Sequence, residues 1–208
     1  ENAEEGAVKL NSILQSGITT FVTLTEAHEP RGACYGYSAF RAAAEEQHRQ
    51  LYGPRRQAKK AGVELRFLRC PMPDAGVTSD QLLFRLLESV LEELQEGRAV
   101  YVHCYGGHGR TGIVGCSLLT LLFEVEASTA VEIFNDLHGQ RVECGIGGPG
   151  QFPHSEEQLK QVERVSRLDN AFAGLRHYKQ RSFALRPSAG LQLLDSDEVD
   201  HPTSSEPD

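Results

Sequence analysis

Cys104 and Arg110 stand six positions apart in a glycine-rich stretch, and a thiol with a guanidinium at this spacing can bind a phosphate ester and attack its phosphorus. Gly106, Gly107 and Gly109 lie between them and allow successive backbone N–H groups to converge on one point. The apolar run that follows predicts a helix whose N-terminal N–H groups and dipole add positive potential there. We therefore expect a lowered pKa for the Cys104 thiol and a thiolate at neutral pH.

The residues expected to bind phosphate are the six that follow the cysteine: Tyr105, Gly106, Gly107, His108, Gly109 and Arg110. Thr111 comes next and can hydrogen-bond the sulfur, which would ease the departure of the thiolate in a second step. His103 is expected to order the loop through hydrogen bonds rather than to titrate in catalysis. His108 has two interpretations, an added positive charge when protonated or a shaping of the pocket mouth.

A phosphate ester that is cleaved by a thiolate also needs a proton donor for its leaving oxygen. Asp74 is the preferred candidate, because it follows a predicted strand and lies among prolines and a glycine. An ordinary turn aspartate is the alternative interpretation. Asp80 is the reserve candidate, although it also fits the first turn of a helix, where a negative charge is favourable.

The string HCYGGHGRTG, from His103 to Gly112, resembles the signature HC-x5-R-[ST]-G of the cysteine-dependent protein phosphatases. The segment around Asp74 resembles the general-acid loop of small dual-specificity-like phosphatases. Taken together, the resemblance extends over residues 5–165. It implies a phosphatase of the tyrosine/dual-specificity superfamily that acts through a phosphocysteine intermediate, with no metal and no cofactor.

The string PHSEEQ, from Pro153 to Gln158, resembles the segment that supplies a water-positioning glutamine in some members of this superfamily. Under that resemblance Gln158 would place the water that hydrolyses the phosphocysteine. The commoner pattern has Pro-x-Thr at this point, and this sequence lacks it. Ser155 and Gln158 also have the spacing of a plain helix capping box, which is the alternative interpretation.

Phosphotyrosine in proteins, or phosphoserine and phosphothreonine, is the substrate class that we expect. Lipid and inositol phosphatases of this superfamily tend to carry lysine in the loop, and this loop has none. The basic segment 28–62 favours the alternative of an inositol phosphate or another small phosphorylated molecule, with Tyr35 and Tyr37 stacking on the substrate. The same segment also fits a solvated helical connection. A catalytically inactive phosphate-binding module is the third possibility.

Apolar patterns of period two and period 3.6 define the elements that must position these residues. The predicted strands are 18–24, 63–70 and 99–103. The predicted helices are 3–16, 38–51, 80–96 (with Thr78 and Gln81 as a capping box), 113–123, one that ends at Gly139 with Ser128 or Thr129 as its N-cap, and one from 155 to about 178. This alternation predicts an α/β domain with a central, largely parallel sheet flanked by helices, and with the phosphate loop between a strand and a helix.

The 208 residues are enough for one domain, which we assign to residues 1–185 as the catalytic unit. The remaining segment, 186–208, is acidic and rich in serine and proline, and we expect it to be disordered. Without residues 195–208 the net charge changes from −8 to −2. A nearly neutral folded part makes nucleic acid and anionic membranes unexpected partners, whereas a phosphorylated protein or small molecule is the expected one.

The cysteine pattern predicts a reducing compartment, hence the cytoplasm, because the five cysteines are odd in number and show no pairing pattern. No C-x2-C pair is present, which argues against structural zinc. No apolar run approaches the roughly 20 residues that cross a bilayer. Residue 1 is Glu rather than Met, so we expect a trimmed form, and the question of a removed targeting segment stays open. The oligomeric state is not indicated.

Overall fold

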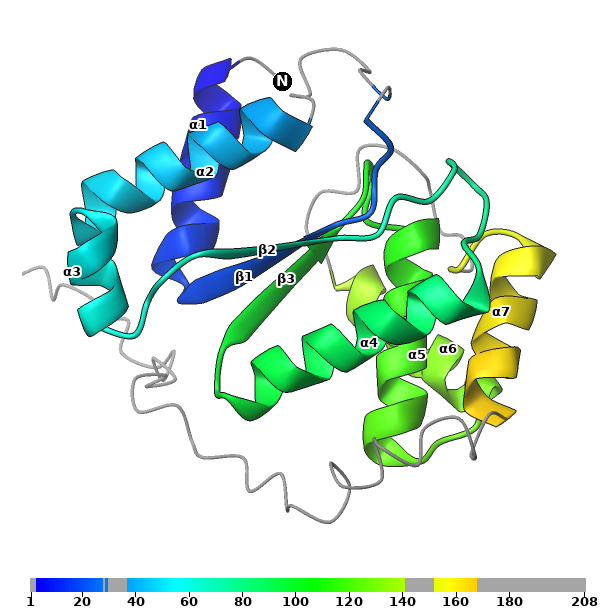
Figure 1. The fold of residues 1–208 in the computed structure, drawn as a ribbon. Helices are drawn as coiled ribbons and strands as arrows, with labels where there is room; N and C mark the ends of the chain where they lie inside the picture. Colours follow the sequence, from blue (N-terminus) through cyan, green and yellow to red (C-terminus); the bar gives the residue numbers. More distant parts are fainter. Residues whose placement is uncertain (1–2, 28, 30–36, 141–151, 168–208) are drawn as a thin grey trace, which may run out of the picture.

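A three-stranded parallel sheet lies at the centre of the computed structural model, which describes residues 3–27, 29, 37–140 and 152–167 (Figure 1). The strands are arranged in the order β2–β1–β3 and are β1 (Ile18–Thr23), β2 (Arg66–Arg69) and β3 (Ala99–His103). The helices are α1 (Ala3–Gln15), α2 (Tyr37–Tyr52), α3 (Arg55–Lys60), α4 (Asp80–Gln95), α5 (Gly109–Phe123), α6 (Ala127–Gly139) and α7 (Glu156–Arg167). The predicted α/β class with a parallel sheet is confirmed.

Helices cover both faces of this sheet because neighbouring strand residues point to opposite sides. Phe21, fully buried, packs against α1 and α2 through Leu14 and Ala44. Val22, its neighbour, is equally buried and belongs to the larger cluster beneath α4 and α5. Figure 1 shows α1 and α2 on one side of the strands and α4 and α5 on the other.

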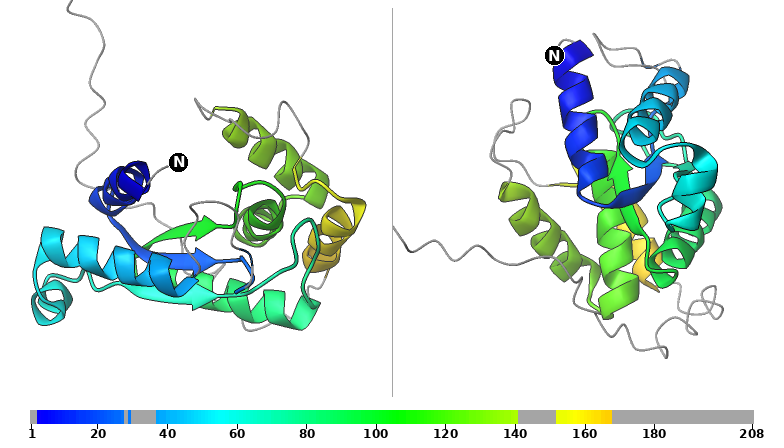
Figure 2. Two further views of the ribbon diagram at one scale, coloured as in Figure 1. Left: turned by 90° about the horizontal axis from the view of Figure 1, so that it is seen from above. Right: turned by 90° about the vertical axis from the view of Figure 1, so that its left-hand side faces the viewer.

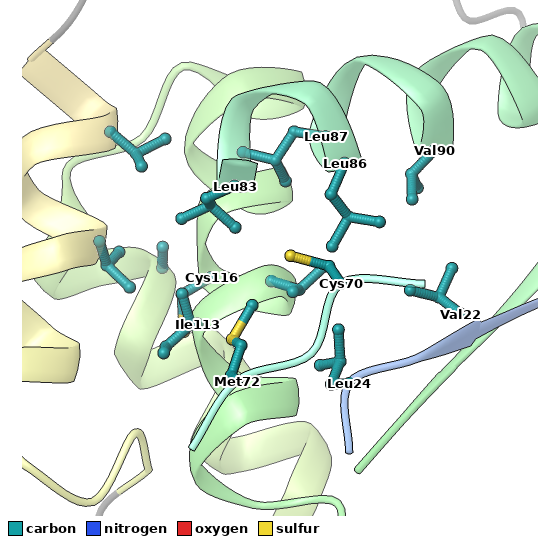
Figure 3. Close-up of a cluster of buried hydrophobic side chains, with 14 of the residues drawn as sticks. Val22, Leu24, Cys70, Met72, Leu83, Leu86, Leu87, Val90, Ile113 and Cys116 are labelled. Atoms are coloured by element: carbon teal, nitrogen blue, oxygen red, sulfur yellow. The ribbon is translucent and has the colours of Figure 1, made fainter. Parts of the chain in front are cut away.

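The larger cluster is built around the apolar stripe of α4. This stripe packs against one face of the sheet and against α5. Figure 3 shows Leu83, Leu86 and Leu87 directed at this cluster, together with side chains from the strand ends. Met72, which follows β2, is fully buried and points into the same cluster. Cys70, which also follows β2, is buried in the same cluster, so these two side chains anchor the segment after β2 in the core.

The three strands end in register, and this determines where the site forms. Thr23 at the end of β1 pairs with Arg69 on one side and with His103 on the other. The carboxyl ends of parallel strands meet at one edge of a sheet, where α/β proteins bind their ligands. The loops that follow β1, β2 and β3 consequently leave from the same edge.

Several predicted boundaries differ from the structure. The chain enters the sheet at Arg66 rather than at Val63, because the Val63 N–H donates to Ala58 O of the short helix α3, which was not predicted. The cap of α4 is Ser79, whose Oγ accepts from Leu82 N at 3.3 Å, and not the predicted Thr78.

Helix α6 begins at Ala127 with Glu126 at the N-cap position, so the predicted caps Ser128 and Thr129 lie inside its first turn. The predicted end of the last helix near 178, the tail 186–208 and residues 34, 35 and 144 lie outside the described residues. The division into a domain at 1–185 and a tail therefore stays a prediction.

Within the described residues, no single helix has the length and the apolar composition that would span a bilayer. Helices α5 and α6 meet those criteria only when they are taken together across a bend of 120°.

Candidate active site

Cys104 lies directly after β3, where hydrogen-bond donors gather around its sulfur. Thr111 Oγ1 donates to Cys104 Sγ at 3.2 Å from the first turn of α5. Burial of Cys104 favours the neutral thiol, but this effect is outweighed by the hydroxyl of Thr111, the backbone N–H groups of Thr111 and Gly107, and the charge of Arg110. Together these groups lower the pKa of the thiol, as expected for a nucleophilic thiolate.

Arg110 is buried, and described groups from two other loops fix its guanidinium. Its Nη1 donates to Glu29 Oε1 at 2.6 Å and to Met72 O at 3.1 Å, and its Nη2 donates to Asp74 Oδ1 at 3.1 Å. Burial opposes the charge, but the bond to Glu29 and the charges of Cys104 and Asp74 raise the pKa of the guanidinium. Arg110 therefore stays cationic beside the sulfur, which a phosphate clamp would require.

Glu29 is the residue of this site that the sequence reasoning missed. It follows β1 and lies 81 positions from Arg110 in the sequence, yet its carboxylate forms the shortest of the three described bonds to that guanidinium. The signal that could have found it is its position after a strand end, which is the argument that selected Asp74 after β2. Its pairing with Arg110 could not be predicted, because the sequence between Glu29 and α2 has no periodic pattern that would place Glu29 in the fold.

Asp74 belongs to the loop of residues 71–79, which we call the acid loop. The backbone of Met72 fixes the start of this loop, since its N–H donates to Leu24 O at 2.9 Å and its O accepts from Arg110. The Asp74 side chain is half exposed and is hydrogen-bonded to Arg110. The structure thus brings the predicted proton donor to the same guanidinium that neighbours Cys104.

Asp80, the reserve candidate, lies away from this cluster. Its two carboxylate oxygens accept from Arg164 Nε and Nη2 at 2.8 and 3.0 Å. The bond from Arg164, assisted by one from Gln161, lowers the pKa of Asp80 despite partial burial. Arg164 takes both oxygens of Asp80, whereas Asp74 is the carboxylate that lies beside Arg110 and Cys104, so the geometry favours Asp74.

Gln158 is fully buried at the start of α7, close to Gly109 of the phosphate loop. Its Nε2 donates to Gly76 O at 2.9 Å, and its Oε1 accepts from the N–H groups of His154 and Ser155. The Ser155 Oγ accepts from Gln158 N at 3.2 Å, so the capping-box interpretation describes this conformation. The water-positioning role of Gln158 stays a prediction.

The His108 ring is buried and packs against other rings. Its Nδ1 lies 2.8 Å from His138 Nε2, and its ring stacks on Phe152 with centroids 4.6 Å apart. A Cβ at Gly106 would lie 2.5 Å from His108 Cδ2, so this ring requires a glycine there. The structure favours the shaping interpretation for the side chain of His108, whose carbonyl also accepts from Gly112 N at 2.7 Å.

His103 supports the loop from inside the sheet. Its Nε2 lies 2.9 Å from Thr23 Oγ1, and its ring contacts Phe40 with centroids 4.8 Å apart. Burial lowers the pKa of His103 to about 4, although a backbone hydrogen bond to Cys104 acts in the opposite direction. The imidazole is therefore neutral near pH 7, which agrees with an ordering role rather than a titrating one.

Three described arginines of the basic segment 28–62 form local ion pairs. Arg41 pairs with Glu45 and Arg49 with Glu46 on α2, and Arg55 pairs with Glu64. Figures 1 and 2 place α3 (cyan) at the end of the sheet from which the strands start, opposite to the phosphate loop. The described geometry fits the solvated helical interpretation, and the predicted stacking of Tyr35 and Tyr37 concerns side chains outside the described part.

A family model described as "Swiss Army Knife protein, DSP-PTPase phosphatase domain" matches residues 4–184. Among curated proteins, cyclin-dependent kinase inhibitor 3 of Mus musculus is 30% identical over 69 residues, which are 33% of this chain and 33% of that protein. The matched stretch thus spans about a third of the length of that curated relative.

Two solved structures share the fold. Tk-PTP in its active form has a TM-score of 0.55 at 20% identity, over 77% of this chain and 85% of that chain. PTPMT1 in complex with PI(5)P has a TM-score of 0.51 at 20% identity, over 78% of this chain and 84% of that chain. At this level of identity, the likeness concerns the architecture of the sheet and its helices.

Proposed function

Because the chain belongs to the DSP-PTPase phosphatase family of Swiss Army Knife proteins, we propose that it hydrolyses phosphomonoesters through a phosphocysteine formed on Cys104. The observation that supports this most directly is the sulfur environment, in which Thr111 Oγ1 and two backbone N–H groups stabilise a thiolate. Such an arrangement has a chemical use in nucleophilic attack, whereas a purely structural cysteine would need no stabilised charge.

The first step transfers the phosphoryl group to sulfur. The Cys104 thiolate attacks phosphorus while Arg110 and the N–H groups of the loop neutralise the phosphoryl oxygens. Asp74 donates its proton to the leaving oxygen as the P–O bond breaks, and an alcohol or phenol departs. The phosphate-binding roles of Tyr105 through Arg110 belong to this proposal and rest on their backbone N–H groups.

The second step hydrolyses the phosphocysteine. Water attacks phosphorus, Asp74 accepts its proton, and the Cys104 thiolate leaves with its charge stabilised by the hydroxyl of Thr111. Gln158, in its predicted role, would place this water after its amide turns away from Gly76. Inorganic phosphate is then the product, and the side chains return to their starting protonation states.

Phosphotyrosine, or phosphoserine and phosphothreonine, in a protein is the substrate class that we propose. The loop contains no lysine, and described bases of segment 28–62 pair on or beside their own helices. Tyr105, next to the nucleophile, is 41% exposed and can contact an aromatic substrate. Free, buried Cys70 and Cys116 fit a cytoplasmic, reducing location, which we propose as well.

A phosphoinositide or soluble inositol phosphate is the second candidate substrate. The observation in its favour is the shared fold of PTPMT1, which was solved with PI(5)P. The position of α3, with Lys59 and Lys60 at the far end of the sheet, speaks against it, because these bases cannot reach a substrate at Cys104.

A substrate panel under reducing conditions tests the proposal. We expect a higher kcat/KM for phosphotyrosyl or phosphoseryl peptides than for inositol phosphates, and no turnover by the C104S variant. Faster turnover of inositol phosphates would overturn the substrate class. Absence of turnover on every substrate, with retained vanadate binding, would indicate a phosphate-binding module instead.

A further inference from the structure

The start of α7 presents a row of polar side chains to the acid loop and to the first turn of α4. Ser155, Gln158, Gln161 and Arg164 follow one another at every third residue, which brings neighbours in the row together on the helix surface. We call these four residues the polar seam. Their partners are residues 75–80, which immediately follow the proposed proton donor.

The first half of the seam binds the two peptide groups next to the donor. Ser155 Oγ donates to Ala75 O at 3.3 Å, and Gln158 Nε2 donates to Gly76 O at 2.9 Å. Both carbonyls belong to the residues that directly follow Asp74 in the chain. A displacement of either peptide would therefore move the Asp74 carboxylate.

The second half of the seam fixes the far end of the loop. Gln161, fully buried, donates through Nε2 to Thr78 O at 2.6 Å and to Asp80 Oδ1 at 2.9 Å. Arg164 adds a two-pronged pair with both oxygens of Asp80, at 2.8 and 3.0 Å. The acid loop is thus held by α7 along its length from residue 75 to the start of α4.

The acid loop adopts a backbone conformation that an L-residue rarely takes up by itself. Ala75, next to Asp74, has φ of 58°, in the left-handed region that disfavours a Cβ. The loop itself supplies one turn bond, from Gly76 N to Pro73 O at 3.0 Å, and one from Ala75 N to Asp74 Oδ1 at 3.1 Å. The bonds from α7 offset the cost of this conformation.

We propose that the polar seam positions the proton donor, so that the protonation of the leaving group depends on α7. This inference rests on the proposed function. Gln161 contacts Thr78 of the loop and Asp80, and Arg164 contacts Asp80. Neither contact involves the reacting atoms, so the two residues act as positioning residues through Asp74. The step that they support is the transfer of the Asp74 proton to the leaving oxygen while sulfur takes the phosphoryl group.

The loss of kcat/KM in a variant of the polar seam should therefore be larger for a substrate whose leaving group needs a proton. An aryl phosphate with a strongly acidic phenol departs as an anion without assistance, whereas phenyl phosphate requires the proton. Damage to the whole fold or to phosphate binding would lower the turnover of both substrates alike. The ratio of the two rates consequently separates positioning from a merely structural role.

The test compares kcat/KM for dinitrophenyl phosphate and phenyl phosphate in wild type, Q161M and R164M. For Q161M we expect a loss of roughly tenfold or more on phenyl phosphate and of less than about threefold on dinitrophenyl phosphate. K160M is the matched control, because Lys160 pairs with Glu156 on the exposed side of α7. It should behave as wild type on both substrates.

A double variant tests the route of the effect. D74N removes the donor, so Q161M added to it should cause no further loss on phenyl phosphate, as required for residues that act as one unit. Equal losses on both substrates, or additive losses in the double variant, would overturn the inference.

Alkylation of Cys104 by iodoacetamide reports whether the phosphate loop is intact in each variant. If Q161M does not fold, R164M tests the same claim, because Arg164 is half exposed and its removal leaves no cavity. A wild type that turns over neither substrate would overturn the proposed function and the inference together. The inference alone would be overturned if wild type turned over both substrates and D74N showed the expected loss, but Q161M and R164M had the same kcat/KM values as K160M.

Discussion

At the scale of the residue, the reactivity of Cys104 comes from neighbours that are contributed by one loop and one helix turn. Cys104, Arg110 and Thr111 are within eight positions of one another, so their relation could be predicted from the sequence. Asp74 could be predicted from its place after a strand, although its bond to Arg110 could not. The position of Glu29 after β1 offered the same signal, but its bond to Arg110 could not be predicted, because it depends on where the chain leads after β1.

Removal of the Thr111 hydroxyl should raise the pKa of the Cys104 thiol, because a hydrogen bond to the thiolate is lost. In T111A we expect slower iodoacetamide alkylation at pH 6 and a loss of roughly 10-fold to 100-fold in kcat, the range for a hydrogen bond to a charged group. T111S keeps the hydroxyl and should resemble wild type. Identical alkylation profiles for T111A and wild type would contradict this account of the sulfur.

His103 should make stability depend on pH between about 6.5, its usual pKa, and about 4, to which burial lowers it. In that window the unfolded chain binds a proton that the folded protein does not, so stability is highest above it and falls as the pH falls. The full difference is on the order of 3 kcal/mol. Urea unfolding at pH 7 and pH 4.5 measures this change in the free energy of unfolding. The free energy of unfolding of H103Q should change less with pH than that of wild type, and an equal change in both proteins would refute the prediction.

At the scale of the element, the site depends on the close approach of α5, α6 and α7. Glycines on α5 permit this approach, since a Cβ at Gly115 would lie 2.7 Å from Phe134 Cε2 of α6, and one at Gly112 would lie 3.3 Å from Pro153 Cγ. The apolar periodicity predicted the existence of these helices. It could not predict which glycine is required by packing, because a glycine that touches a neighbour looks like any other in the sequence.

Two glycine-to-alanine variants should change stability in opposite directions. G115A places a methyl group against the Phe134 ring, and overpacking at a cost of about 1–3 kcal/mol outweighs a helix-propensity gain of about 1 kcal/mol. G6A lies in α1 with nothing within 4 Å of the new Cβ, and it should stabilise by about 0.5–1 kcal/mol. Urea unfolding measures the change in the free energy of unfolding of each variant relative to wild type. Changes of the same sign in G115A and G6A would contradict the packing account.

At the scale of the whole molecule, the parallel sheet explains why distant residues meet. The strand ends Thr23, Arg69 and His103 are paired, and the loops that follow them bring Glu29, Asp74 and Cys104 to one edge. Fold class, family and enzyme class were predicted from the sequence and are confirmed by the sheet topology and the family match. The docking of α7 on the acid loop was not predicted, because its bonds connect residues more than 80 positions apart.

Direct detection of the phosphocysteine on Cys104 tests the central claim most directly. Enzyme and a phosphotyrosyl peptide are mixed, quenched within the first turnover, digested and analysed by mass spectrometry. We predict one phosphoryl group on the peptide that contains Cys104, its disappearance in C104S, and its loss as inorganic phosphate forms. Turnover without any phosphoryl group on Cys104, or turnover that survives in C104S, would contradict the account.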